Sequence, residues 1–352
     1  MNKKTLVSIL GIIISILLLF WLFKNINWVE FKNALSQAQY LIVVLGMLVH
    51  FSGFYFRTLR WRELMLPNLN VSDESKESVP NDLSQNATSN DENLNASSNA
   101  TSNITTRKKA TMYNVFAPLA MGYATNNILP LRIGDILRGA FAGVRLNASK
   151  AMLFSTVIIE RVIDVVTLFV LLCLVMIFHQ VLSWAYTSIL AACLVVGLIV
   201  LVLIAKNKKL IEKIVPKFAR NFIDNIVDGF NCIKSMPQLA KVIGYSFCIW
   251  FIEFLTVLII SYAFGMQYQL LMSLLIVVLI NLVIIIPAAP GNFGTLEAAA
   301  QQGFIMFGAE PSHAMAMSLV LHMVQYIPIT ITGFVIIAKE GININDKTKL
   351  QD

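Results

Sequence analysis

Three ionisable residues stand inside one apolar stretch of this sequence. At about 100° per residue along a helix, Glu160 and Asp164 fall nearly on one face, with Arg161 beside them. A charge at the centre of a bilayer costs about 2.5–3.5 kcal/mol on insertion scales, so such groups pair and face the interior of a bundle. The stretch therefore predicts either an internal salt bridge between helices or a polar site for a headgroup or a proton.

Two breaks with the same Pro-x-x-x-Gly spacing interrupt the apolar sequence. The first runs from Pro130 to Gly134, and Asp135 follows it. The second contains Pro290, Gly291 and Gly294, followed by Glu297. Backbone outside a helix survives at membrane depth only where protein or a water-filled cavity covers it. The breaks therefore predict a polar site inside a membrane protein, and their matching spacing hints at an internal repeat.

The first break is expected to bind an anion. Arg132 lies inside it and Arg138 follows it, and the planar guanidinium can bind two phosphate oxygens. A helix that begins near Gly134 would add its N-terminal amides. Positive charge on the cytoplasmic side of a membrane is the alternative explanation, and it accounts for Arg145 and Lys150 better than for Arg132.

Further polar residues could complete such a site. Asn126 and Asn127 would bind the headgroup together with the arginines. The residues expected to line or gate a polar path are Asp135, Glu160, Arg161, Asp164, Glu253 and Glu297. Each has a structural alternative, such as helix capping for Glu297 or an interhelical contact for Glu253, His50, His322 and Gln325. Gly291 and Gly294 permit unusual backbone angles. Arg57, Arg60, Trp61 and Arg62 could belong to the same basic mouth, but interfacial anchoring is the favoured role.

The elements that must position these residues are long apolar stretches. The chain is 57% hydrophobic and 13% charged, whereas soluble domains are about half apolar and about a quarter charged. A membrane span needs about 20 predominantly apolar residues. The stretches of this kind are Leu6–Phe23, Tyr40–Phe56, Ala151–Phe178, Trp184–Ala205, Val242–Phe264, Leu270–Ala289 and Ala314–Ala338.

Two further segments are apolar but too short or too polar for an ordinary span. Val115–Leu129 ends near Asn126 and Asn127, and Phe293–Phe307 carries Glu297. Both are predicted to be broken or re-entrant. The fold class is therefore all-α, a polytopic transmembrane helix bundle of seven or eight spans with two broken or re-entrant segments.

The domain organisation follows from composition. Residues 1–66 hold the first two spans, and residues 67–110 form an insertion rich in Ser, Asn and Thr that is predicted to be disordered and cytoplasmic. Residues 111–342 form the core, with an amphipathic helix near 208–236, and residues 343–352 form a polar tail. Lys3 and Lys4 place the N-terminus in the cytoplasm, and the surrounding arginines place the first break near the cytoplasmic side. The expected location is the inner (plasma) membrane of the cell.

Signatures of other functions are missing from the sequence. It has no phosphate-binding glycine loop, no nucleophile motif and no zinc-type set of His and Cys. Its cysteines lack Cys-x-x-Cys spacing and are expected to be small buried hydrophobes. No enzymatic activity, cofactor, metal or nucleic-acid partner is expected.

The ordered set of motifs resembles the lysylphosphatidylglycerol synthetase transmembrane-region family, the flippase-like integral membrane proteins. The resemblance covers nearly the whole chain outside residues 67–106. The residues that carry it are Arg60-Trp61, Asn126, Asn127, Leu129-Pro130, Arg132, Gly134, Arg138, Glu160-Arg161, Asp164, Pro287, Pro290-Gly291, Gly294 and Glu297. Asp135 and Asn292 depart from it, since glutamate and glycine are commoner there.

The resemblance implies a membrane protein that moves a lipid. The expected substrate is an anionic or modified phospholipid, or a polyprenyl-linked or hopanoid-type lipid. Two alternatives remain open. One is a membrane subunit that transports nothing and anchors a glycosyltransferase or a lipid-modifying enzyme. The other is a membrane-embedded lipid transferase.

Overall fold

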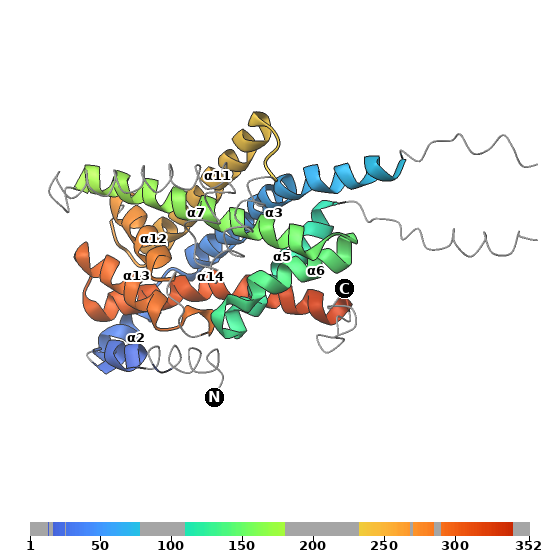
Figure 1. Cartoon of the computed structure of the whole chain (residues 1–352). Helices are drawn as coiled ribbons and strands as arrows, with labels where there is room; N and C mark the ends of the chain where they lie inside the picture. Colours follow the sequence, from blue (N-terminus) through green and yellow to red (C-terminus); the bar gives the residue numbers. More distant parts are fainter. Residues whose placement is uncertain are drawn as a thin grey trace, which may run out of the picture.

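The computed structural model shows a bundle of α-helices (Figure 1). The structure describes residues 13, 17–24, 26–77, 110–179, 232–267, 270–284 and 290–340. Every regular element in these ranges is an α-helix or a 3-10 turn, with no strand among them. The predicted all-α class is therefore confirmed for the part of the chain that the structure describes.

The helix bounds follow the apolar stretches closely. The elements are α2 (Trp28–Gln37), α3 (Tyr40–Glu77), α5 (Met112–Ile128), η3 (Pro130–Arg132), α6 (Ile133–Leu146), α7 (Lys150–His179), α11 (Met236–Ala263), α12 (Leu270–Ile284), η4 (Pro290–Asn292), α13 (Thr295–Met306) and α14 (Pro311–Glu340). The predicted spans that began at Tyr40, Ala151, Val242, Leu270 and Ala314 thus correspond to α3, α7, α11, α12 and α14.

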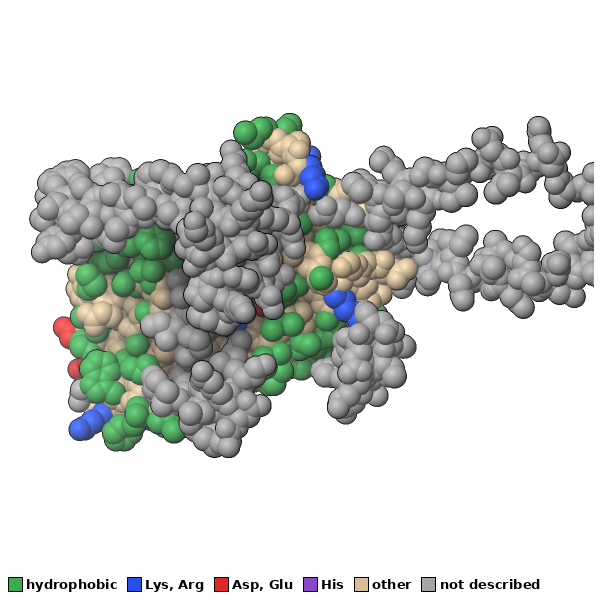
Figure 2. Space-filling model, viewed as in Figure 1, with side chains coloured by type: hydrophobic (Ala, Val, Ile, Leu, Met, Phe, Trp, Pro, Cys, Tyr) green, Lys and Arg blue, Asp and Glu red, His purple; other side chains and the backbone are tan. Residues whose placement is uncertain are grey.

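Three of the described helices are long and apolar enough to cross a membrane. They comprise residues Tyr40–Pro67, Met236–Ala263 and Pro311–Glu340. In the described part of the face drawn in Figure 2, hydrophobic side chains are widespread and charged ones are few. Large apolar side chains such as Leu41, Leu48 and Phe247 are exposed on the outside of these helices. An exposed apolar belt of this kind is what lipid contact requires.

The structure extends the second span beyond its expected end. An end at Phe56 was expected, with a disordered insertion from residue 67, but α3 continues as a helix to Glu77. The continuation packs, because Trp61, Leu64 and Met65 are fully buried. Residues 78–109, the fourth predicted span, most of the predicted amphipathic helix and most of the first span lie outside the described residues.

Two helical hairpins lie at the predicted breaks. α5 packs along α6, and α12 packs along α13. Figure 1 shows the α5–α6 hairpin, in blue-green, and the α12–α13 hairpin, in orange, towards opposite sides of the view. The turns of the two hairpins, η3 and η4, contact each other. The two broken segments are therefore hairpins whose turns meet inside the bundle.

The chain repeats the order of its elements. A long helix, a hairpin and a second long helix occur as α3, α5–α6 and α7, and again as α11, α12–α13 and α14. The long helix after each hairpin packs on the first arm of the other hairpin, α14 on α5 and α7 on α12. Since Arg57 pairs with Glu253 and Arg60 with Ser246, α3 and α11 run antiparallel. This arrangement is typical of an inverted repeat.

The backbone of the two turns repeats as well. Arg132 and Asn292 are each the third residue of the 3-10 turn, and both have left-handed backbone angles, with φ of 53° and 60°. Gly291 and Gly294 have φ of 65° and 84°, so the unusual angles expected of them are confirmed. A left-handed arginine is uncommon and strained by roughly 1–3 kcal/mol, and such residues cluster at functional sites.

The first hairpin closes through glycine at Gly134. A methyl group built there would meet the carbonyl oxygen of Gly122 and would lie 2.7 Å from the backbone nitrogen of Asn126. Both obstacles belong to the backbone of α5, which cannot rotate away. The two arms of this hairpin can therefore approach only because a side chain is absent.

We expect Gly134→Ala to lower the free energy of unfolding by about 1–3 kcal/mol, the usual cost of overpacking. Thermal unfolding of the purified protein in detergent would measure it. Gly244→Ala on α11 is the matched control, because no atom lies within 4 Å of the added methyl group. Equal melting temperatures for the two variants would contradict this account of the hairpin.

Candidate functional site

A polar cavity of about 190 Å³ lies where the two hairpin turns meet. Both hairpins and α3, α7, α11 and α14 contribute to its wall. Its polar lining consists of His50, Arg57, Tyr123, Asn126, Asn127, Arg132, Asp135, Arg161, Glu253, Asn281, Asn292, His322, Gln325 and Tyr326. Phe54, Ile280, Ile284 and Leu296 supply apolar surface.

The cavity lies at mid-length along the helices that could cross a membrane. Arg57 stands near the middle of Tyr40–Pro67, Glu253 near the middle of Met236–Ala263, and His322 and Tyr326 near the middle of Pro311–Glu340. The first break therefore lies beside the middle of these helices and not beside their ends. The break lies there because it follows α5, a helix that rises by about 1.5 Å per residue along its axis.

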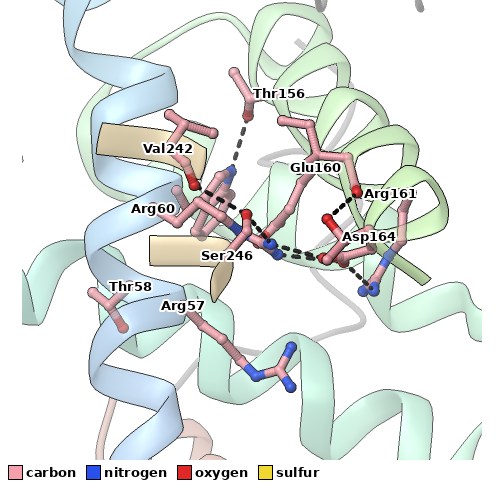
Figure 3. A network of polar contacts seen from close by, with 12 residues as sticks. Arg57, Thr58, Arg60, Thr156, Glu160, Arg161, Asp164, Val242 and Ser246 are labelled. Atoms are coloured by element: carbon pink, nitrogen blue, oxygen red, sulfur yellow. Dashed lines mark hydrogen bonds and ion pairs between the residues drawn. The ribbon is translucent and has the colours of Figure 1, made fainter. Parts of the chain in front are cut away.

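A buried ion-pair network supports one wall of this cavity (Figure 3). Arg60 of α3 points between two carboxylates of α7, donating to Glu160 Oε1 at 2.8 Å and to Asp164 Oδ1 at 2.7 Å. The same guanidinium donates to the hydroxyl of Ser246 on α11 at 3.0 Å. Three helices thus converge on Arg60, which is completely buried.

Arg138 completes the network from α6. Its guanidinium pairs with the second oxygen of Glu160, and it lies over the ring of Trp61, 4.8 Å from the ring centroid. The indole nitrogen of Trp61 donates to the hydroxyl of Thr156 at 2.9 Å. Glu160 is thereby held between two arginines from different helices, and none of the three side chains is exposed by more than 1%.

Arg161 connects the network to the cavity. It donates to Asp135 Oδ1 at 2.9 Å and lies 3.5 Å from Asp164. Asp135 stands in the first turn of α6 and also accepts from the amide of Asn126 at 3.1 Å. Asp135 and Arg161 are therefore both paired while they line the cavity.

Arg57 and Glu253 form the second ion pair of the lining. Arg57 donates to Glu253 Oε1 at 2.6 Å and to the hydroxyl of Tyr123 at 3.2 Å. The other carboxylate oxygen of Glu253 accepts from the amide of Gln325 at 3.3 Å and lies 3.6 Å from Nδ1 of His50. The interhelical contact expected of Glu253 is thus present.

Arg132 differs from every other arginine at the site. It donates to the carbonyl oxygen of Ile284 at 3.0 Å, and no carboxylate of the described residues lies within ion-pair distance of it. This bond joins the first turn to the end of α12. A cation that lines a polar cavity with hydrogen-bonding capacity to spare is suited to hold an anion.

The turn of the second hairpin carries a buried pair of its own. Glu297 accepts from the backbone nitrogen of Gly294 at 2.7 Å, so its predicted capping role is present. Its other oxygen lies 2.6 Å from Nδ1 of His322, whose Nε2 lies 3.0 Å from the carbonyl oxygen of Gly291. Glu297 is not exposed at all, and His322 borders the cavity.

The structure divides the residues that the sequence singled out. Those that line the cavity are His50, Arg57, Asn126, Asn127, Arg132, Asp135, Arg161, Glu253, Gly291, Asn292, His322 and Gln325. Arg138, Glu160 and Asp164 lie in the network behind it, and the guanidinium of Arg138 pairs with Glu160. Pro130, Gly134, Pro290 and Gly294 shape the turns, and Glu297 reaches the cavity only through His322.

The sequence patterns did not identify the residues of α3 that belong to the ion-pair network. Arg60 and Trp61 were favoured as interfacial anchors, but both are fully buried, because α3 continues past its apolar window. The signal that could have identified them is charge balance, since Arg161 alone cannot neutralise both Glu160 and Asp164. Tyr123, Tyr326 and Asn281 carried no signal of their own in the sequence.

The chain is similar to one protein family and to several membrane proteins. Residues 8–333 match the protein family described as lysylphosphatidylglycerol synthase TM region. The chain is also similar to a UPF0104 membrane protein of Methanocaldococcus jannaschii, with 27% identity over 222 residues, covering 59% of this chain and 90% of that protein.

Two further UPF0104 membrane proteins are comparably similar. One from Methanothermobacter thermautotrophicus is 23% identical over 262 residues, which cover 66% of this chain and 77% of that protein. A second one from Methanocaldococcus jannaschii is 27% identical over 258 residues, which cover 64% of this chain and 74% of that protein. No solved structure matches the chain.

We expect Glu160→Gln to lower the free energy of unfolding by about 3–5 kcal/mol, because it leaves buried arginine charge uncompensated. Thermal or denaturant unfolding in detergent would measure the loss. The matched control is Glu63→Gln, whose partner Lys241 is 58% exposed, so that its loss should cost about 0–1 kcal/mol. If both variants unfold alike, the buried network does not have the structural role assigned to it.

Proposed function

Since the chain belongs to the lysylphosphatidylglycerol synthase transmembrane-region family and is a membrane protein, we propose that it translocates a lipid with an anionic phosphate headgroup across the bilayer. The headgroup would occupy the cavity between the two hairpin turns. The lipid would be a phospholipid or a polyprenyl-linked or hopanoid-type lipid with such a headgroup.

The observation that carries this proposal is the state of Arg132. It is the cavity-lining arginine that has no carboxylate partner among the described residues, and its strained backbone holds it at the meeting point of the turns. A guanidinium with free donors binds two phosphate oxygens at once. Asn126 and Asn127 line the same cavity and could supply further donors.

The charge balance around the cavity favours one negative charge on the ligand. The arginines of the cavity and the network are Arg57, Arg60, Arg132, Arg138 and Arg161, and the carboxylates are Asp135, Glu160, Asp164 and Glu253. Five positive charges therefore face four negative ones, and a phosphodiester would neutralise the remainder. An isolated charge inside a bilayer is costly, so neutrality of the loaded site matters for its movement.

An apolar groove beside the cavity favours a lipid over a small solute. The groove lies between α3 and α5, and its lining includes Phe51, Tyr55, Tyr113 and Phe116. Phe54 lines both the groove and the polar cavity. A phosphate headgroup in the cavity would thus leave its acyl or prenyl chain against the apolar groove.

The inverted repeat favours translocation over static binding. In transporters with such repeats, the substrate site lies near the bilayer midplane, and rocking of one repeat against the other exposes it alternately to the two sides. The cavity here lies between two hairpins of corresponding position. We place the protein in the inner (plasma) membrane with a cytoplasmic N-terminus, because Lys3 and Lys4 precede the first span. Translocation needs no enzymatic activity in this proposal.

Arg132→Ala should slow translocation by about 10- to 100-fold, the effect of losing hydrogen bonds to a charged group. Purified protein reconstituted in vesicles with dye-labelled phosphatidylglycerol provides the rate. Arg132→Lys should retain part of it, because lysine keeps the charge and loses the planar fork.

The matched control is Arg62→Ala. Arg62 also donates to one backbone carbonyl, that of Ala110, at 2.7 Å, but it does not line the cavity. Its rate should equal that of the wild type. An unchanged translocation rate in Arg132→Ala would refute the assignment of the headgroup site. If the wild-type protein moves no lipid unless an enzyme is added, the anchoring function is favoured. Formation of a new lipid by the purified protein would favour a transferase.

Ser52→Trp tests the groove, because Ser52 belongs to its lining. Each methylene of the lipid chain that the indole keeps out of the groove would lose about 0.8 kcal/mol of burial free energy. The exclusion of two methylenes would therefore weaken lipid binding about tenfold. The same vesicle assay would show the slower rate. Leu41→Trp is the control, since Leu41 is 86% exposed and lies outside the groove. Equal effects of the two substitutions would argue against the groove.

A further inference from the structure

His322 and Glu297 form a buried pair that the proposed headgroup site does not use. The carboxylate and Nδ1 of the imidazole are 2.6 Å apart, and neither side chain is exposed by more than 3%. The pair joins α13 to α14 directly behind the turn η4. No other ion pair within the described residues has both a histidine and a carboxylate at hydrogen-bond distance.

The hydrogen bonds of this pair imply a bound proton. Both ring nitrogens of His322 face oxygen acceptors, Nδ1 facing Glu297 Oε1 and Nε2 facing the carbonyl oxygen of Gly291. A neutral imidazole has only one N–H group. Both hydrogen bonds can form only if the pair holds one proton more than a neutral imidazole and a carboxylate. With that proton, on the imidazole or on the carboxyl group, the pair is electrically neutral.

The pair is fastened to the backbone of the second turn. Glu297 Oε2 accepts from the nitrogen of Gly294, and His322 Nε2 reaches the carbonyl of Gly291, so the pair contacts both glycines of the Pro-x-x-x-Gly break. The ring of His322 also packs on Phe293, with centroids 4.6 Å apart. The protonation of the pair therefore bears directly on the conformation of the turn.

The pair has a route to the cavity, because His322 lines it. The other titratable groups that line the cavity, from every element around it, are His50, Arg57, Tyr123, Arg132, Asp135, Arg161, Glu253 and Tyr326. Asp135 pairs with Arg161, and Glu253 pairs with Arg57. Both carboxylates that line the cavity thus have arginine partners, whereas the partner of His322 is itself a carboxylate.

We propose that the His322–Glu297 pair is the proton-binding site that couples lipid translocation to pH. The protonated pair keeps both of its hydrogen bonds to the second turn. Because this pair is neutral, the net positive charge of the cavity stays available to an anionic headgroup at Arg132. Release of the proton to water in the cavity leaves one uncompensated negative charge beside the headgroup and breaks a hydrogen bond to the turn. Proton and anionic lipid thus bind together, an inference that rests on the proposed function.

The first test is the pH profile of translocation in vesicles with dye-labelled phosphatidylglycerol. In the wild type, the rate should fall at least about tenfold as the pH of the assay is raised from about 5 to about 8. In Glu297→Gln, the profile should be flat, since the pair can no longer release its proton from a carboxyl group or leave a carboxylate behind.

Two histidine variants show which residue causes the fall in rate with rising pH, called the pH step below. His313→Gln is the matched control, because His313 contacts the carbonyl of Phe264 and does not line the cavity, so both rate and profile should match the wild type. His50→Gln should keep the pH step. A step that disappears in His50→Gln and persists in Glu297→Gln would overturn the proposal and assign the proton to His50.

A second measurement does not depend on transport. Hydrogen exchange of the backbone at residues 291–297, corrected for the intrinsic pH dependence of exchange, should show protection that falls with rising pH in the wild type and stays constant in Glu297→Gln. Protection that is independent of pH in the wild type would overturn the proton site even if lipid moves. Vesicles in which no lipid moves would overturn the proposed function, and the exchange data would still decide on the proton site.

Discussion

The buried carboxylate of Glu160, held between Arg60 and Arg138, is the interaction on which the rest of the structure depends. It joins α7 to α3 and α6, and Arg60 extends the contact to α11 through Ser246. Each of these charges would be costly alone in a low-dielectric interior, so the helices can close only with all the partners present. Through Arg138 the network ties α6, and with it the first turn that carries Arg132, to α7.

The pairing of the other arginines leaves the charge of Arg132 uncompensated. The arginines behind the cavity wall pair with Glu160 and Asp164, and the other two arginines that line the cavity pair with Asp135 and Glu253. Arg132 alone reaches the cavity from a strained turn without a carboxylate among the described residues. Structural pairing and the proposed anion binding are thus divided between arginines that are close in sequence.

The two hairpins are alike in backbone and different in chemistry. Each has a Pro-x-x-x-Gly turn with a left-handed third residue, and the turns touch at mid-length of the long helices. The first turn presents Arg132, and the second presents Asn292 with the His322–Glu297 pair behind it. In the proposed coupling of anion and proton, the first turn would bind the anion and the second turn would bind the proton.

Local patterns in the sequence predicted most of the helices and much of the polar chemistry. Apolar run lengths predicted α7, α12 and α14 closely, and the prolines and glycines predicted both breaks, because these residues restrict or free the backbone wherever they occur. Only the tertiary structure decided which charges meet. Arg60 pairs with a carboxylate 100 residues away, Arg138 turns inward while Arg132 turns to the cavity, and the two turns meet each other. Such partners depend on how helices pack, and helix packing depends on side-chain fit across elements that no local pattern records.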